Sequence, residues 1–418
     1  MKRIYVTGGK PLRGSVRTSG SKNAAVALLP AALLCPGEIA LENVPRIGDI
    51  FTMEQLLTAL GVRARFIPAT GRMQVDASRV ETSDAPYELV KKMRASFCIA
   101  GPLLGRLGRT RVPLPGGCDI GARSVDYHIK GMEALGARVR IEHGYVEAET
   151  DGLKGATILL DTPSVGATCH IATMACLAEG TTIIQNAAEE PEVVDLANFI
   201  NAMGGIVRGA GSGTMEIEGV KALRPTTYRV IPDRMEAGSF LIAAAATAGD
   251  VHVTGCVPEH LTSLILKLQE AGTEIVQGPD WVSVRGPVRP RAVSVKTLPY
   301  PGFPTDMQQP VTSLLATAAG TSVITETIYE RRFRHTDELR QMGADIRQEG
   351  QSAIINGVER LSGARVTASD LRAGAALIIA GLMAHGTTEI SGVEHIERGY
   401  EDIIGKFSQL GVTVGCLE

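Results

Sequence analysis

The chain has 418 residues, a formal net charge of −3, 44% hydrophobic residues and only 4% aromatic residues. This length exceeds what one hydrophobic core usually supports, so two or three domains are expected, with cores built from small and aliphatic side chains. The slightly acidic balance argues against a general nucleic-acid binder, although it leaves room for a local basic pocket that takes a small anion.

The cysteines and the apolar runs indicate the compartment. Seven cysteines without a Cys-x-x-Cys spacing predict free thiols in a reducing cytosol rather than a disulfide scaffold. The N-terminal apolar run is too short for a signal peptide, and the longest apolar stretch, residues 24–35, contains Pro30 and is too short to cross a bilayer. We therefore expect a cytoplasmic protein that binds no membrane, no metal and no cofactor.

Two interleaved series of glycines predict an internal repeat. In the first series each glycine ends an apolar-periodic stretch and precedes a β-prone run, which is typical of a helix, a glycine cap and a strand. In the second series each glycine lies between a small-residue helix and a strand. The first series is Gly61, Gly136, Gly204, Gly272, Gly343 and Gly411, with spacings of 75, 68, 68, 71 and 68 residues. The second series is Gly37, Gly108, Gly180, Gly249, Gly320 and Gly386.

The chain is therefore predicted to contain six copies of an α/β unit of about 70 residues, with buried small-residue helices and sheets outside. Six units divide into three and three. The stretch before residue 20 has strand character, precedes the first small-residue helix and is expected to complete a unit of the second half. We predict a first lobe over residues 22–231, a second lobe over residues 1–21 plus 232–418, and an active site in the cleft between them.

Taken along the chain, the first candidate for chemistry is the opening of the first small-residue helix, Ser19-Gly20-Ser21-Lys22-Asn23. The free N–H groups at such a helix start favour an anion, and Lys22 adds a positive charge. The alternative is a capped helix with a surface lysine.

Cys118 follows, in a loop with glycines at 116, 117 and 121 and with Arg123 five residues later. A thiol near a cation in a mobile loop is chemically useful. Asp119 is expected to raise its pKa and Arg123 to lower it, and the sequence does not decide which effect dominates. We predict that this loop is a lid that closes when substrate binds.

Arginines mark further loops and helix starts. Arg94, Arg234 and Arg372 open small-residue helices at matching repeat positions, where the alternative is a structural Arg–Asp pair. Arg332 and Arg398 lie in later loops. Arginine binds phosphate and carboxylate in a planar, bidentate way, so these residues indicate a small substrate with concentrated negative charge.

These segments together resemble the enolpyruvyl transferase family, and most closely its branch that acts on UDP-N-acetylglucosamine. The resemblance runs nearly end to end and rests on segments at 20–25, 93–96, 115–123, 164–168, 303–307, 370–373 and 398–401. It implies a two-lobed inside-out α/β barrel with three βαβαββ-type repeats in each lobe. It also implies transfer of the enolpyruvyl group of phosphoenolpyruvate to the 3′-hydroxyl of UDP-N-acetylglucosamine with release of phosphate, the first committed step of peptidoglycan synthesis, by a protein expected to be monomeric.

The resemblance also implies the roles of individual residues. Cys118 is expected to protonate the enol carbon, and Asp306 to accept the proton of the sugar hydroxyl. Lys22, Arg123 and Arg398 are expected to hold the phosphate, Arg332 and Arg372 the carboxylate, and Asp370 to assist proton transfer. Expected contacts to the UDP-sugar are Asn23, Arg94, Arg123, Ser124, Val125, Asp126, Tyr127, Thr162, Pro163, Ser164, Val165, Asp306 and Ile328.

Two other functions stay open. One is that of the sister enolpyruvyl transferase of the shikimate pathway, which Lys22-Asn23-Ala24-Ala25 and the Cys118 loop disfavour. The other is a catalytically silent paralogue that binds UDP-sugar, which the presence of Cys118, Asp306 and Lys22 disfavours.

Overall fold

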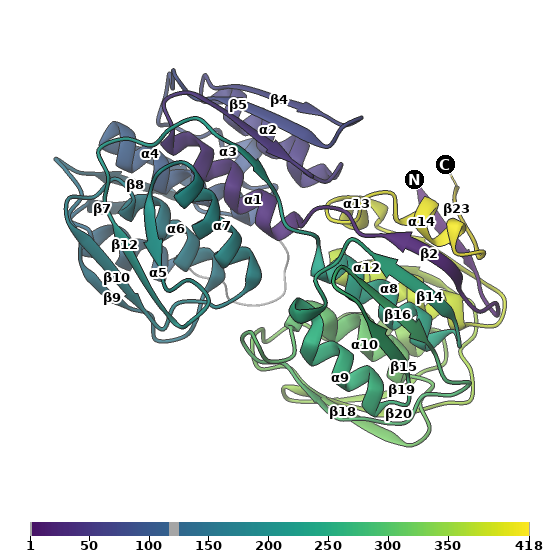
Figure 1. Ribbon diagram of the computed structural model, residues 1–418. Helices are drawn as coiled ribbons and strands as arrows, with labels where there is room; N and C mark the ends of the chain where they lie inside the picture. The colour runs from purple at the N-terminus through teal and green to yellow at the C-terminus, as the bar shows by residue number, and fades with distance from the viewer. Residues whose placement is uncertain (1, 117–124, 418) are drawn as a thin grey trace. The chain divides into compact units, whose positions relative to one another are not determined.

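The chain folds into two compact units of mixed α/β structure, and the predicted α/β class is confirmed. The computed structural model shown in Figure 1 describes residues 2–116 and 125–417. We call residues 20–116 and 125–231 the first unit, and residues 2–19 and 232–417 the second unit. Each unit encloses its own hydrophobic core.

The first unit contains three sheets among its described residues, with strand orders β13-β3-β5-β4, β6-β8-β7 and β11-β12-β10-β9. In the first of them β3 pairs antiparallel with β5 and parallel with β13. The strands alternate buried and exposed side chains, as expected for sheets with one face on a core. Their bounds are β3 Glu38–Glu42, β4 Arg63–Ile67, β5 Arg72–Asp76, β6 Arg109–Pro113, β7 Arg138–Glu142, β8 Tyr145–Glu149, β9 Thr157–Leu159, β10 Thr181–Gln185, β11 Ile206–Arg208, β12 Thr214–Glu218 and β13 Thr227–Arg229.

The helices of the first unit include two that are buried along most of their length, α1 and α6. A helix that is apolar on all sides must lie inside a core, and small side chains let such helices pack closely. The bounds are α1 Lys22–Ala31, η1 Ala32–Leu34, α2 Gly48–Ala59, α3 Tyr87–Val90, η2 Arg94–Ile99, α4 Ala100–Leu107, α5 Asp126–Ala134, α6 Val165–Ala175 and α7 Pro191–Ala202.

The second unit has three sheets, with strand orders β21-β22-β1-β23, β15-β16-β14-β2 and β17-β18-β20-β19. The N-terminal strands complete two of these sheets. Strand β1 lies between β22 and β23 and is antiparallel to both, and β2 lies parallel beside β14 (Figure 1). The bounds are β1 Arg3–Thr7, β2 Arg13–Arg17, β14 Asp250–Thr254, β15 Glu274–Gln277, β16 Trp281–Arg285, β17 Val295–Lys296, β18 Thr321–Thr325, β19 Asp345–Glu349, β20 Ser352–Asn356, β21 Arg365–Thr367, β22 Thr387–Ser391 and β23 Thr413–Leu417.

Three helices of the second unit, α8, α10 and α12, are buried on almost every face. The sequences of α8 and α12 are rich in Ala and Gly, whereas α10 is built from Gln, Val, Thr, Ser and Leu with one Pro. Polar residues at the helix starts are described in the next section. The bounds are α8 Arg234–Ala246, η3 Pro258–Leu261, α9 Thr262–Glu270, η4 Thr305–Met307, α10 Gln308–Leu315, α11 His335–Gln341, α12 Leu371–Met383, α13 Val393–Glu397 and α14 Ile403–Gln409.

The first glycine series ends helices as predicted. Gly61, which follows α2, has a φ of 85°, and the other five glycines of the series have φ between 85° and 98°. This left-handed conformation is costly for a residue with a Cβ atom and allows the chain to leave the helix and enter the next strand.

Candidate active site

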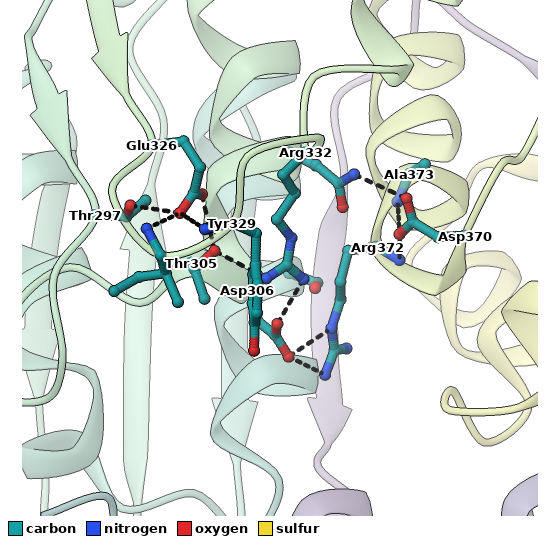
Figure 2. Close-up of polar contacts among 12 residues, drawn as sticks. Thr297, Thr305, Asp306, Glu326, Tyr329, Arg332, Asp370, Arg372 and Ala373 are labelled. Atoms are coloured by element: carbon teal, nitrogen blue, oxygen red, sulfur yellow. Dashed lines mark hydrogen bonds and ion pairs between the residues drawn. The ribbon is translucent and has the colours of Figure 1, made fainter. Parts of the chain in front are cut away.

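A carboxylate between two buried guanidinium groups is the centre of the candidate site in the second unit. Asp306 lies in the 3₁₀ turn η4 that leads into α10, Arg332 in the loop after β18, and Arg372 in the first turn of α12. Arg332 Nη2 donates to Asp306 Oδ1 at 2.6 Å. Arg372 Nε donates to Asp306 Oδ2 at 3.1 Å, and Nη2 of the same guanidinium forms an ion pair with that oxygen at 3.0 Å. Figure 2 shows both guanidinium groups directed at this carboxylate.

Burial makes this arrangement electrostatically strong. The side chains of Arg332 and Arg372 are 4% and 3% exposed, and that of Asp306 is 24% exposed. Burial is the largest single effect on the pKa of Arg332 and lowers it, but Asp306, Tyr329 and Asp370 together outweigh burial, so the pKa lies above its usual value. Burial likewise lowers the pKa of Arg372, while Tyr400, Asp306 and Asp233 together raise it by more. Both guanidinium groups are therefore fixed cations beside a partly accessible carboxylate.

Aromatic rings also support the two arginines. The guanidinium of Arg332 lies 5.1 Å from the ring centroid of Tyr329, and that of Arg372 lies 5.3 Å from the ring centroid of Tyr400. The Tyr400 hydroxyl is 2.8 Å from Ser239 Oγ on α8. Cation–π contacts hold the planes of the guanidinium groups and limit their rotation.

Asp370 is the N-cap of α12. Its Oδ1 accepts from the backbone N–H groups of Arg372 at 2.8 Å and Ala373 at 3.0 Å, and its Oδ2 accepts from Gln309 Nε2 at 2.9 Å. Asp233 caps α8 in the same way. At these helix starts the aspartate therefore bonds to the backbone, and Arg372 forms its ion pair with Asp306, the aspartate at the start of another small helix.

A second carboxylate of this unit, Glu326, is buried and was not predicted from the sequence. Its side chain accepts hydrogen bonds from the hydroxyls of Thr297 and Thr305, both at 2.8 Å, and from the backbone N–H of Ile328 at 2.8 Å (Figure 2). Its position in the sequence could have indicated its burial. Side chains alternate between the two faces of a strand, and Glu326 lies two residues after the buried Ile324, so both are on the same face.

In the first unit Lys22 begins α1, which Ser21 caps by accepting from Ala24 N at 3.3 Å. Lys22 Nζ lies 3.1 Å from Asp49 Oδ2, and the side chains are 15% and 2% exposed. Asn23 is the next residue of α1 and Arg94 begins η2, and both are partly buried. Lys22 is thus a half-enclosed cation at a helix start rather than a freely solvated surface lysine.

Residues predicted to contact the sugar nucleotide come together where α5 and α6 begin. Tyr127 Oη is 3.0 Å from Thr162 Oγ1 and accepts from Thr162 N at 3.2 Å. Ser164 caps α6 by accepting from Ala167 N at 3.4 Å. Asp126 lies in the first turn of α5 and Val165 in that of α6. The remaining members of this set, Val125 and Pro163, directly precede Asp126 and Ser164.

Three predicted site residues, Cys118, Arg123 and Ser124, lie outside the described residues, as does the loop predicted to act as a lid. Arg398 directly follows α13, is partly buried, and lies two residues before Tyr400.

Three described cysteines, Cys98, Cys169 and Cys176, have thiols whose pKa is raised, so they stay protonated at neutral pH. Burial raises the pKa of Cys98 and of Cys176 to about 12, and the pKa of Cys169 is raised further above its usual value, first by burial. Cys169 and Cys176 are core thiols, with exposures of 4% and 1%. A thiol that stays protonated at neutral pH is a poor nucleophile.

Among the described residues, no cluster of three or more His, Cys, Asp or Glu side chains is arranged to hold a metal ion. Within the same residues, no helix has the length and apolar character needed to cross a membrane.

Comparison with known proteins decides the family. The sequence profile of EPSP synthase (3-phosphoshikimate 1-carboxyvinyltransferase) matches residues 6–407. The chain belongs to this family of enolpyruvyl transferases. Within the family it is 52% identical over 416 residues to UDP-N-acetylglucosamine 1-carboxyvinyltransferase 2 of Carboxydothermus hydrogenoformans, covering 99% of each chain. It is 50% identical over 415 residues to UDP-N-acetylglucosamine 1-carboxyvinyltransferase of Clostridium botulinum, again covering 99% of each.

Solved structures of this family share the fold. The enolpyruvyl transferase NikO from Streptomyces tendae matches with a TM-score of 0.90 and 25% identity, over 99% of this chain and 98% of that one. EPSP synthase from Acinetobacter baumannii matches with a TM-score of 0.78 and 17% identity over the full length of both chains, which is a likeness of fold alone.

Proposed function

We propose that this enolpyruvyl transferase transfers the enolpyruvyl group of phosphoenolpyruvate to the 3′-hydroxyl of UDP-N-acetylglucosamine and releases phosphate. The observation that carries the proposal is the identity of 50–52% over 99% of the chain to enzymes named for that reaction. The Asp306 carboxylate between Arg332 and Arg372 supplies a base and two cations of the kind that the reaction needs. The product is the starting point of peptidoglycan synthesis, and we propose that the enzyme acts as a cytoplasmic monomer.

The proposed reaction is an addition followed by an elimination. In the addition, the sugar oxygen forms a bond to C2 of phosphoenolpyruvate, the hydroxyl proton goes to Asp306, and Cys118 donates a proton to C3. The resulting tetrahedral ketal carries the phosphate, the carboxylate and the sugar on one carbon. In the elimination, C3 gives a proton back to the Cys118 thiolate and the C2–O bond to phosphate breaks. The phosphate leaves with the proton that Asp306 had taken, and the enolpyruvyl ether is released.

The cations of the site are proposed to stabilise the charge of the substrate during these steps. Arg332 and Arg372 take the carboxylate of phosphoenolpyruvate, while Lys22, Arg123 and Arg398 take its phosphate. Because the two arginines already face Asp306, the entering carboxylate shares them with that side chain. Asp370, which holds the start of α12, is proposed to assist the proton transfer.

The residues around the starts of α5 and α6 are proposed to bind the sugar nucleotide, together with Asn23, Arg94, Asp306 and Ile328. The contact between Tyr127 and Thr162 supports this assignment because it brings two of the proposed segments together. Ser164 and Val165 stand at the N-terminus of α6, where the N–H groups of the first helical turn suit an anionic pyrophosphate.

We also propose a finer description of the fold, in which each unit is an inside-out α/β barrel with three βαβαββ-type repeats. The shared strand pattern of the sheets and the burial of α8, α10 and α12 support this description.

The test is phosphate release from phosphoenolpyruvate in three parallel reactions, with UDP-N-acetylglucosamine, with shikimate 3-phosphate and with neither. Release that depends on the UDP-sugar is expected. Phosphate release only in the reaction with shikimate 3-phosphate would assign the chain to the activity of the sister enzyme. No release in any of the three reactions would favour the catalytically silent paralogue.

The role of Cys118 has a separate test. The epoxide fosfomycin is expected to alkylate Cys118 in the folded protein, and Cys118→Ser is expected to abolish both the labelling and the phosphate release. Labelling of Cys98 or Cys169 in its place would contradict the assignment of this thiol.

A further inference from the structure

Glu326 is a buried carboxylate whose hydrogen bonds divide into two groups. Its side chain lies at the end of β18 and is 1% exposed. Oε1 accepts from Thr297 Oγ1 at 2.8 Å and from the backbone N–H groups of Ile328 at 2.8 Å and Tyr329 at 3.2 Å. Oε2 accepts from Thr305 Oγ1 at 2.8 Å. Oε1 therefore fixes the loop after β18, whereas Oε2 reaches toward Asp306.

The hydroxyl of Thr305 connects Glu326 to Arg332 through two hydrogen bonds. A hydroxyl has one proton, and in Thr305 that proton is directed at Glu326 Oε2, so an oxygen lone pair faces Arg332. Arg332 Nη1 donates to this oxygen at 2.8 Å, while Nη2 of the same guanidinium donates to Asp306 Oδ1 at 2.6 Å. The two bonds together fix the plane of the guanidinium and, through it, one oxygen of Asp306 (Figure 2).

We propose that Glu326 and Thr305 are positioning residues that orient Arg332 and Asp306 for the transfer of the enolpyruvyl group. Neither residue is proposed to touch substrate. The inference rests on the proposed function, in which Asp306 accepts the proton of the sugar hydroxyl and Arg332 binds the carboxylate of phosphoenolpyruvate. Such support from a second layer of residues determines whether reacting groups meet in productive geometry.

The division of bonds at Glu326 separates positioning from simple structural support. Thr305→Val removes the hydroxyl that links Oε2 to Arg332 and keeps nearly the same volume, while the three bonds at Oε1 are untouched. Thr305→Ser keeps the hydroxyl. The matched control is Thr312→Val in α10, because Thr312 is fully buried in the same unit and its hydroxyl donates at 2.8 Å to the carbonyl of Gln308, within the helix.

Glu326→Gln is a complementary change at the other end of the link. Its amide nitrogen must face either Thr305 or the N–H groups of Ile328 and Tyr329. In the first case the Thr305 hydroxyl loses its acceptor, and in the second two donors face each other. This variant is therefore expected to disturb the loop as well as the site, so Thr305→Val is the cleaner test.

The experiment measures steady-state phosphate release with both substrates varied, for the wild type and the three threonine variants. For Thr305→Val we expect kcat to fall about 10- to 100-fold and KM for phosphoenolpyruvate to rise several-fold, with KM for the UDP-sugar within about threefold of wild type. Thr305→Ser is expected to recover at least about a third of the wild-type kcat, and Thr312→Val to match the wild type. Fluorescence of Trp281, the one tryptophan of the chain, reports the folded fraction of the same unit.

The outcomes separate the inference from the proposed function. An inactive wild type overturns the proposed function and this inference with it. An active wild type with unchanged kinetics in Thr305→Val overturns only the inference. A loss in Thr305→Val that Thr312→Val shares, or that is explained by a smaller folded fraction with both KM values unchanged, also overturns it, because a general packing defect does not select one substrate.

Discussion

Replacement of Asp306 by asparagine tests the electrostatic core of the second unit. Asparagine keeps the shape of the side chain but removes its negative charge. Its amide oxygen can accept from one arginine only, and its amide nitrogen then faces the other guanidinium, donor to donor. Arg332 and Arg372, which are 4% and 3% exposed, would remain as two buried cations on either side of a neutral group.

The size of the effect follows from this geometry. Removing one partner of a buried ion pair costs about 3–5 kcal/mol, because the remaining charge stays desolvated. Asp306 is 24% exposed, so water reaches the site and the lower end of the range, about 3 kcal/mol, applies. For a unit of this size about 1 kcal/mol shifts the melting temperature by roughly 2–4 °C, which gives a decrease of about 6–12 °C.

The assay is urea and thermal unfolding followed by the fluorescence of Trp281, with and without inorganic phosphate. Because both guanidinium groups lose their hydrogen-bonded carboxylate in the variant, phosphate is expected to stabilise it more than the wild type. Phosphate at about 100 times its Kd would recover about 2.7 kcal/mol. The control is Asp337→Asn, which removes the partner of Arg340 in a pair whose side chains are 72% and 39% exposed and is expected to cost less than about 1 kcal/mol.

Two results would refute the reasoning. One is a loss of stability below about 1 kcal/mol, which would mean that the arginines do not depend on Asp306 for neutralisation. The other is an equal response of variant and wild type to phosphate, which would mean that removing the carboxylate creates no anion site.

Three further predictions concern other parts of the molecule. Asp370→Ala removes the cap of α12 and the acceptor of Gln309, so the unfolding free energy of the second unit is expected to fall by about 1–2 kcal/mol in urea titrations, and a change within error would contradict the capping role. Burial raises the pKa of Asp195 from 3.8 to about 6, so the folded state binds this proton more tightly than the unfolded state does. The free energy of unfolding is therefore expected to fall by about 2–3 kcal/mol as the pH rises from about 4 to 6. Unfolding followed by circular dichroism should show that Asp195→Asn removes this dependence of stability on pH. Burial raises the pKa of Cys176, which is 1% exposed, so mass spectrometry after iodoacetamide treatment of the folded protein at pH 7.5 should find it unmodified, and its rapid labelling would show that the core opens.

Much of the fold could be predicted from the sequence, because it depends on the chemistry of residues that are close together in the chain. A glycine is needed where a helix ends in the left-handed conformation, and Gly61 and the five glycines that share its role adopt that conformation. The strand character of the N-terminal stretch likewise predicted its membership in the second half, where β1 and β2 complete two sheets. In each case the requirement acts on a few neighbouring residues or on a strand as a whole.

The geometry of the site was harder to predict, because its contacts join elements that are far apart in the sequence. The sequence indicated that Asp306, Arg332 and Arg372 matter, but their mutual contact depends on how the starts of α10 and α12 pack against the loop after β18. Glu326 was missed because a single glutamate after a strand is usually solvated, and only its four partners in space show that it is not.

The position of β1 has a consequence for biosynthesis. This strand is synthesised long before β22 and β23, between which it lies. The first unit is encoded between the N-terminal strands and residue 232, so it can fold while the second unit is still being synthesised. Strand β2 gains its partner when β14 is made, but the backbone groups of β1 stay unpaired until β22 and β23 follow. A nascent chain truncated before β22 is therefore expected to expose β1 to chaperones and proteases.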